Sequence, residues 1–157
     1  MQLNWLKIFI FIGVLSFISC DSNTVFEENL KIKEGMWDRQ EKAHFEFEIK
    51  DSSAIYDIYV NFRHGGDYPY QNIYLFTETR SPSGRLAKDT AQILLADNKG
   101  RWFGKGIGDI FDYQLRFKRG DLFPENGVYH FELEQAMRDE VLESVTDVGI
   151  SVKKVNL

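Results

Sequence analysis

The sequence predicts an all-β protein: an antiparallel β-sandwich with a jelly-roll-like strand order and one short helix before the last strand. Apolar and polar residues alternate with a period of two in several runs, as in strands that bury one face. Clusters of Gly, Pro, Asn and Asp separate these runs, as expected for two packed antiparallel sheets. The part of the chain after residue 19 holds about 138 residues, which is enough for one domain with a full core.

The chain begins with the pattern of a bacterial lipoprotein signal. An uncharged apolar run, residues 8–18, follows Lys7, and Cys20 comes just after it. The run is about 11 residues long, too short to cross roughly 30 Å of hydrocarbon, but it fits the core of a secretory signal. We therefore expect residues 1–19 to be removed and the thiol of Cys20 to be acylated. The alternative is an uncleaved N-terminal anchor helix with an incidental cysteine.

A tether is expected after the signal. Cys20 is the only cysteine, so no internal disulfide can form. The residues that follow it are polar, and we interpret residues 20–34 as the acylated cysteine and a tether to a sandwich domain at residues 35–157.

The strands are read from the alternation, in order along the chain. The residues expected to face the core are Phe45, Phe47 and Ile49; Tyr56, Ile58, Val60 and Phe62; Tyr113, Leu115 and Phe117; Tyr129, Phe131 and Leu133; and Val148, Ile150 and Val152. Residues 72–79 and 90–96 alternate less cleanly but are apolar enough to form strands. Residues 134–145 instead space their apolar side chains roughly as a helix does, which predicts a short helix or turn before the last strand.

The charge of the chain argues against nucleic acid as a partner. The formal net charge is −5, and it becomes about −6 once the signal and Lys7 are removed. A surface with this sign repels phosphate backbones.

A glycine-rich run, GRWFGKGIGD at residues 100–109, raises the question of a phosphate site. A dinucleotide fingerprint needs a glycine where this run has Asp109, and it must precede a helix. A Walker loop ends in Gly-Lys-Ser/Thr, whereas here glycine follows Lys105. The glycines are better explained by positive φ angles or close backbone approach beside Trp102, and the alternative is a loop that contacts a ligand.

The residue types of common catalytic and metal sites do not form a recognisable constellation. His44, His64 and His130 lack metal-ligand spacing. His44 and His130 fall on the outward phase of expected strands, and His64 falls in an expected turn with a polar capping role. No serine lies in a G-x-S-x-G motif, and the paired glutamates of the strands face outward. We expect no enzyme, no cofactor and no metal, with a structural calcium at residues 96–100 as the alternative.

Aromatic residues in two loops offer a candidate binding surface. Tyr68 and Tyr70 flank a proline, and Trp102 and Phe103 lie in the glycine-rich run. If exposed, these rings can stack on sugars or anchor a protein partner, and if buried they cap the ends of the core. Arg138 is a further candidate, since Trp and Arg are common hot-spot residues. The alternative is that Trp102 closes the core and Arg138 pairs with an internal acid.

The chain resembles the GldH-type gliding-motility lipoproteins of the Bacteroidetes over nearly its whole length. The words that carry the resemblance are Cys20-Asp21, Trp37, Phe45, Phe47, Asp51, NFRHGGDYPYQNIYLF (which includes Arg63), Asp89-Thr90, LLADNKGRWFGKGIGD, GVYHFELEQAMR and DVGI. His64 stands where asparagine is expected in this family.

The resemblance implies a membrane-anchored, non-enzymatic component of the gliding machinery, tied to the secretion system that exports its adhesins. It supplies no catalytic residues. Relatives also occur in species that do not glide. The residues after Cys20 lack the dense acids that resemble a surface-export tag in this group, which favours the periplasmic side of the outer membrane.

Two functions follow as hypotheses. The first is an interaction protein that docks on other envelope or gliding proteins, with Arg63, Tyr68, Tyr70, Trp102 and Arg138 as candidate partner-binding residues. The second is a glycan-binding module that uses Tyr68, Tyr70 and Trp102.

Overall fold

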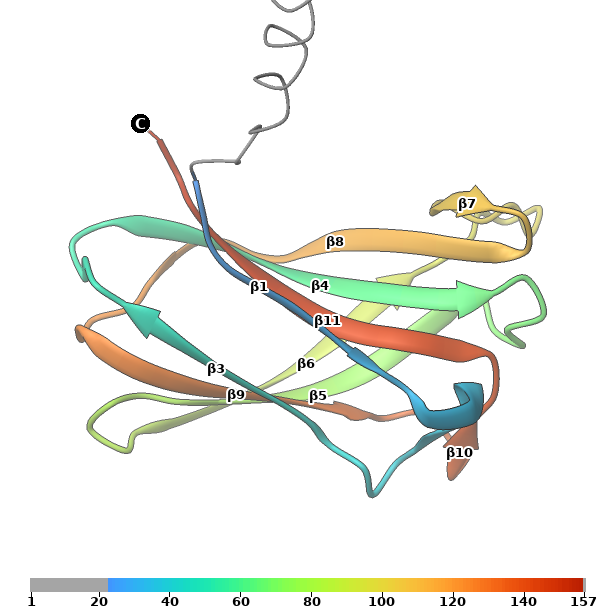
Figure 1. The fold of residues 1–157 in the computed structure, drawn as a ribbon, viewed down its shortest axis with the longest axis horizontal. Coiled ribbons are helices and arrows are strands. Elements are labelled where there is room, and N and C mark those ends of the chain that lie inside the picture. Colours follow the sequence, from blue (N-terminus) through green and yellow to red (C-terminus); the bar gives the residue numbers. More distant parts are fainter. Residues whose placement is uncertain (1–22, 157) are drawn as a thin grey trace, which may run out of the picture.

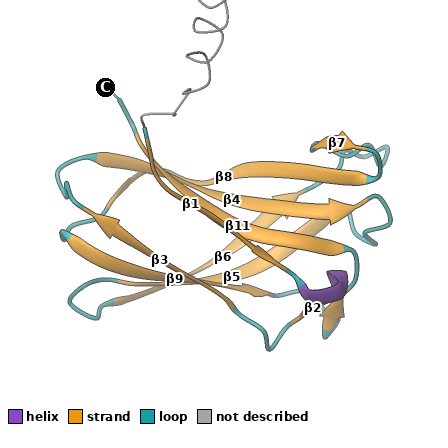
Figure 2. Cartoon of the chain, in the orientation of Figure 1, coloured by secondary structure: helices purple, strands orange, loops and turns teal. Residues whose placement is uncertain are grey.

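The computed structural model describes residues 23–156, which form two antiparallel sheets packed face to face (Figure 1). The strands are β1 (Thr24–Lys31), β2 (Trp37–Asp38), β3 (Ala43–Ile49), β4 (Ile55–Gly65), β5 (Asn72–Arg80), β6 (Leu86–Leu94), β7 (Lys105–Ile107), β8 (Ile110–Leu122), β9 (Gly127–Gln135), β10 (Val141–Leu142) and β11 (Val145–Lys154). A single 3-10 turn, η1 (Lys33–Gly35), is the one helical element in the described part of the chain (Figure 2).

The strand order is that of a jelly roll. One sheet has the order β1-β11-β4-β8-β7 and the other the order β3-β9-β5-β6. The main pairs are β1 with β11, β3 with β9, β4 with β8, and β5 with β6, all antiparallel. These are the pairs of one long hairpin rolled up across two sheets, which is how a jelly roll is built. The predicted antiparallel sandwich with a jelly-roll-like order is confirmed.

The core lies between the two sheets and is rich in aromatic and β-branched side chains. In β3, β4, β9 and β11 the predicted alternation is confirmed, because their inward residues are at most 4% exposed. In β8 the inward residues Tyr113, Leu115 and Phe117 pack on this core but are only partly buried. The reason is position, since only the three residues of β7 lie beyond β8 at that edge of the sheet.

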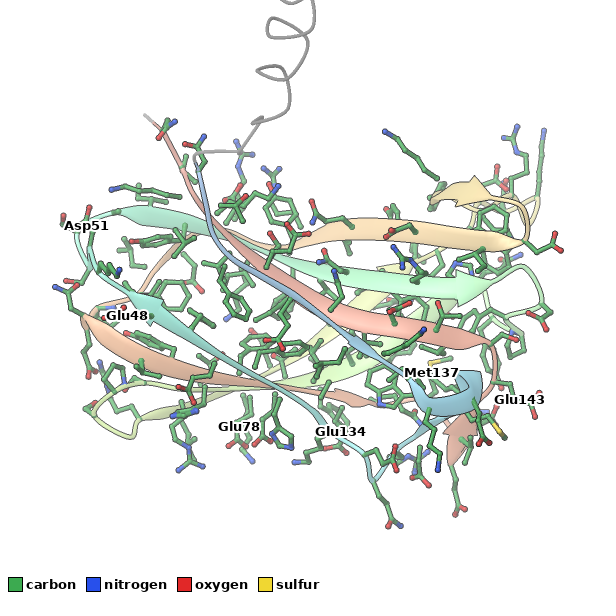
Figure 3. All side chains as sticks on the ribbon, in the orientation of Figure 1. Glu48, Asp51, Glu78, Glu134, Met137 and Glu143 are labelled. Atoms are coloured by element: carbon green, nitrogen blue, oxygen red, sulfur yellow. The ribbon has the colours of Figure 1, made fainter. Side chains whose placement is uncertain are left out.

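The sandwich has two ends that differ in what they carry. At the terminal end the chain enters and leaves side by side, and the amide of Lys154 donates to the carbonyl of Asn23 at 2.8 Å. Loops 50–54, 81–85 and 123–126 lie at this end. Loops 66–71, 95–104 and 136–144 lie at the opposite, distal end. In Figure 3, Asp51 marks the terminal end, and Met137 and Glu143 mark the distal end.

The predicted tether is shorter than residues 20–34, because residues 24–31 form β1. This strand pairs with β11 over its length and contributes Phe26 and Leu30 to the edge of the core. Its approach to β11 is close: a Cβ on Gly149 would lie 2.3 Å from the carbonyl oxygen of Glu28. Only glycine fits such a place in a strand. The sandwich therefore begins at Thr24 rather than at residue 35.

The predicted short helix before the last strand is wrong. Residues 136–140 form a bend, and Val141 and Leu142 form β10, which pairs with β2. The backbone of the bend is held by side chains: the Arg39 guanidinium donates to the carbonyls of Met137, Arg138 and Asp139. Those carbonyls are the acceptors that a helix would need for its own ladder. Within residues 23–156, no helix has the length and apolar character needed to cross a membrane.

Candidate functional site

Three loops that are far apart in the sequence meet at the distal end. The amide of Gly66 donates to the carbonyl of Asp109 at 2.7 Å, which joins loop 66–71 to the segment before β8. The amide of Leu95 donates to the carbonyl of Gln71 at 2.8 Å. The hydroxyl of Tyr70 donates to the carboxylate of Asp139, which joins the same loop to residues 136–140. We call this assembly of loops 66–71, 95–109 and 136–140 the distal cap.

His64 lies at the base of the distal cap, and its predicted turn position is wrong. It continues the inward phase of β4, and its side chain is fully buried. Its ring is 4.5 Å from the Trp102 ring and 5.8 Å from the Phe111 ring, measured between centroids. Nδ1 lies 2.8 Å from the carbonyl oxygen of Gly65, which places the ring proton on Nδ1. Burial among these rings lowers the pKa of His64, so the side chain is neutral in the fold.

Trp102 covers His64 and is itself partly buried, with one face on the core. It forms an isolated bridge with Ala96, so the glycine-rich run folds back on its own loop. A Cβ on Gly104 would lie 2.9 Å from the carbonyl oxygen of Asp112, and Gly108 has a φ of 65°. Close approach and positive φ thus account for these two glycines. The loop therefore has the positive φ angle and the close backbone approach that were expected for its glycines.

The two tyrosines of loop 66–71 have different environments. Tyr68 is 3% exposed, and burial raises the pKa of its hydroxyl. It packs edge-on against Phe62 and Tyr70, so it caps the core and presents no free ring face for stacking on a ligand. Tyr70 is partly exposed, and its hydrogen bond to Asp139 raises the pKa of its hydroxyl.

Two residues that sequence reasoning missed shape the bend at residues 136–140. Gln135 is fully buried, and its amide nitrogen donates to the carbonyls of Asp139 and Glu140 at 3.0 and 3.1 Å. Its amide oxygen accepts from the amide of Met137 at 3.0 Å. Arg39 holds the same bend from the other side. Gln135 could have been found from the sequence, because it is a polar residue at an inward position of β9. Nothing in the sequence around Arg39 indicates its role.

Arg138 is exposed at the crest of this bend. It lies near enough to Tyr70 to lower the pKa of that hydroxyl, against the larger effect of Asp139. Its guanidinium forms no hydrogen bond or ion pair with another described residue. The structure therefore brings Tyr68, Tyr70, Trp102 and Arg138 together. Arg63 lies on the outer face of β4, beside the distal cap, where it lines a hollow with Lys105 and Gly106 of the cap.

Arg63 is held by ion pairs on that outer face. Its guanidinium lies 2.7 Å from the carboxylate of Asp112 on β8 and 3.5 Å from that of Asp147 on β11. It thus links three neighbouring strands, and only part of its side chain is exposed. Phe103, which follows Trp102 in the distal cap, is 48% exposed.

The described residues contain no grouping of three or more His, Cys, Asp or Glu side chains that could hold a metal ion. His44 and His130 lie on the outer face, as predicted, next to Glu132 and Glu46. In loop 95–104 the carboxylate of Asp97 accepts from the amides of Lys99 and Arg101, and hydrogen bonds from Arg101 lower its pKa. This carboxylate is thus engaged by its own loop. Cys20, the predicted lipid attachment residue, lies outside the described residues.

Comparisons with known proteins identify the family of the chain. A family model described as "GldH lipoprotein" matches residues 24–152. A protein of Christiangramia forsetii named "Gliding motility lipoprotein GldH homolog" is 36% identical over 94% of this chain and 95% of its own length. "Gliding motility lipoprotein GldH" of Flavobacterium johnsoniae is 30% identical over 91% of this chain and 92% of its own length.

Among solved structures, "Structure of infectious bursal disease virus Gx strain" aligns at a TM-score of 0.32 with 8% identity. It covers 83% of this chain but only 29% of that one, and a similarity this low carries no argument. The family model and the two relatives are sufficient without it: the chain belongs to the GldH lipoprotein family.

Proposed function

We propose that this protein is a lipid-anchored component of the cell envelope that acts by binding another protein of the gliding machinery through its distal cap, without catalysis. Three of the sequence segments that carry the family resemblance meet in this cap, although they lie in separate loops. They are NFRHGGDYPYQNIYLF, LLADNKGRWFGKGIGD and GVYHFELEQAMR. This convergence is the observation that carries the proposal. The names of the relatives support the assignment to gliding motility.

The exposed side chains of the distal cap suit a protein partner. Phe103 in the cap and Ile110 just after it are 48% and 46% exposed, and Arg138 is exposed on the bend at residues 136–140 without an ion pair to another described residue. Aromatic and arginine side chains on a rigid support are the usual anchors of protein interfaces. Tyr70 and Trp102 support these exposed side chains, because each packs partly on the distal end of the core.

The test of the distal cap uses variants on its surface. Phe103→Ala and Arg138→Ala should leave the melting temperature nearly unchanged, abolish complementation of a deletion strain, and remove the partner captured by affinity pull-down. Glu48→Ala, at the terminal end, is the matched control. Full complementation by a Phe103→Ala/Arg138→Ala double variant would contradict a binding role for this cap.

The lipid anchor has its own test. Cys20→Ala should leave the sandwich folded but move the protein out of the membrane fraction, because the acyl chains supply the attachment. If the variant stayed in the membrane fraction after a high-salt wash, the attachment would have another cause. We place the protein on the periplasmic side of the outer membrane, and degradation of the domain by protease added to whole cells would contradict that side.

A glycan-binding role is the second candidate, at a different place from the one the sequence predicted. Tyr68 is buried, so the predicted aromatic trio is not free to stack on sugars. Instead, a shallow hollow of about 280 Å³ lies on the outer face of the four-stranded sheet around Phe76, which is 50% exposed. Lys42, Lys88, Glu78 and Glu134 line it. Saturable binding of envelope glycans that Phe76→Ala removes would favour this candidate.

A further inference from the structure

The chain between the predicted lipid and the first strand is very short. Strand β1 begins at Thr24, so only residues 21–23 separate Cys20 from the sandwich. An extended chain spans at most about 3.5 Å per residue, which holds Thr24 within roughly 15 Å of the acylated cysteine. The tether that the sequence predicted would have allowed the domain to turn freely, but this one brings the terminal end to the membrane.

Exposed aliphatic side chains lie at this same end. Leu122 ends β8 and is 59% exposed, and Leu86 begins β6 and is 51% exposed. Both line a hollow of about 290 Å³ that opens between the two sheets, with Ile58 and Phe123 in its wall. The exposed aromatic side chains lie elsewhere, on the outer face of β5 and near the distal cap. Two leucines that flank an apolar opening are more than a scattered exposed residue.

The charges around the two leucines are compatible with a lipid surface. The acids near the hollow are neutralised: Glu125 pairs with Arg85 at 2.6 Å, and Asp121 pairs with Lys118 at 3.7 Å. Arg119 follows Lys118, which lines the hollow, near the end of β8; it is exposed and forms no ion pair with another described residue. Apolar side chains with cations beside them are attracted to a headgroup layer, where the cation meets phosphate.

From the short tether, the exposed leucines and the free arginine, we propose that the terminal end of the sandwich rests in the headgroup layer of the bilayer that holds Cys20. Leu86 and Leu122 enter the layer, and Arg119 contacts lipid phosphates. The sandwich then stands on the membrane, and β8, which is 13 residues long, carries the distal cap roughly 40 Å away from it. The inference rests on the lipid anchor proposed above.

The first experiment measures which end touches lipid. Because Cys20 is the only cysteine and is used by the acyl chain, Leu122→Cys and Arg138→Cys each introduce one free thiol for an environment-sensitive fluorophore. The acylated full-length protein is placed in vesicles of phosphatidylethanolamine and phosphatidylglycerol with brominated acyl chains. Quenching should be at least about threefold stronger at position 122 than at position 138. Equal quenching at the two positions would overturn the proposal.

The second experiment removes the contact and keeps the anchor. A fluorophore on Lys50→Cys, at the terminal end, reports the distance to lipid in a Leu86→Asp/Leu122→Asp background. Its quenching should fall to the level seen at position 138, whereas Phe103→Asp, a change at a similarly exposed apolar residue, should leave it unchanged. Unchanged quenching in the Leu86→Asp/Leu122→Asp variant would contradict the contact between the terminal end and the lipid. Loss of either variant from the membrane fraction would count instead against the lipid anchor.

Discussion

His64 shows how one buried side chain links the distal cap to the core. Its ring touches Phe62 on one side and Trp102 and Phe111 on the other, and its Nε2 has no hydrogen-bond partner among the described residues. The neutral tautomer is the only form that fits this site, because a charge would have to be buried among aromatic rings.

Acid should therefore destabilise the fold through His64. The fold lowers the pKa of His64 below the value of about 6.5 in the unfolded chain. Its contribution is present above pH 6.5 and is lost as the pH falls below that, because the unfolded state binds a proton that the fold excludes. His64→Asn should flatten the slope of unfolding free energy between pH 7 and pH 5, measured by urea denaturation. An equal slope in both proteins would show that His64 is not the titrating group.

Trp102 and Arg138 should separate packing from binding. Trp102→Ala removes a half-buried ring that covers His64, and it should lower the unfolding free energy by about 2 kcal/mol. Arg138→Ala removes an exposed side chain without a partner and should change it by less than about 0.5 kcal/mol. Thermal melts beside complementation check both. A large fall in stability for Arg138→Ala would mean that the arginine supports the bend instead of a partner.

The bend at residues 136–140 has no regular backbone hydrogen bonding of its own and is held by hydrogen bonds from side chains. Gln135 and Arg39 approach it from two sides and satisfy its carbonyls, so the bend is rigid although it has no regular structure. This rigidity holds Arg138 at the surface of the distal cap.

Gln135→Leu should collapse this support. The leucine fills a similar volume but leaves the amide of Met137 without its acceptor and removes one of the two donors to the carbonyls of Asp139 and Glu140, which should cost about 2 kcal/mol. Gln92→Leu, on the exposed outer face of β6, is the matched control and should cost little. Urea denaturation measures both. Equal stabilities would show that water replaces the lost hydrogen bonds.

Alternation predicted some elements well and others poorly, for physical reasons. Strand β3 buries every second residue, so its pattern is complete in the sequence. Strand β1 lies at a sheet edge and buries no residue fully, so its polar sequence was read as a tether. In the region of β10, apolar residues at helical spacing were misleading, because Arg39 holds that backbone from about a hundred residues away.

For the candidate site, the arrangement of the residues could not be predicted from the sequence. Tyr68, Tyr70, Trp102 and Arg138 do meet, but the burial of Tyr68 and the exposure of Phe103 depend on how three loops pack. His64 was placed in a turn because two glycines follow it. The inward phase of β4 continues through it all the same, since Phe62 lies two residues earlier.

On the scale of the whole molecule, β1 is part of the sandwich and should be indispensable. A protein that begins at residue 35 loses β1, exposes the edge of β11 and removes Phe26 and Leu30 from the core. Unpaired edges of this kind promote aggregation. This variant should be insoluble or unfolded by circular dichroism, whereas one that begins at Asn23 should fold. A folded, monomeric protein beginning at residue 35 would contradict the role of β1.

The place of β11 in the sheet also determines when the protein can fold. Its ten residues follow all the other strands in the sequence, yet they lie between β1 and β4 in the five-stranded sheet. A chain that is synthesised and delivered from its N-terminus has an empty place in the middle of that sheet until the final segment arrives. Pairing between the two ends of a chain is also the slowest kind to form. The five-stranded sheet therefore cannot be completed before β11 has been made.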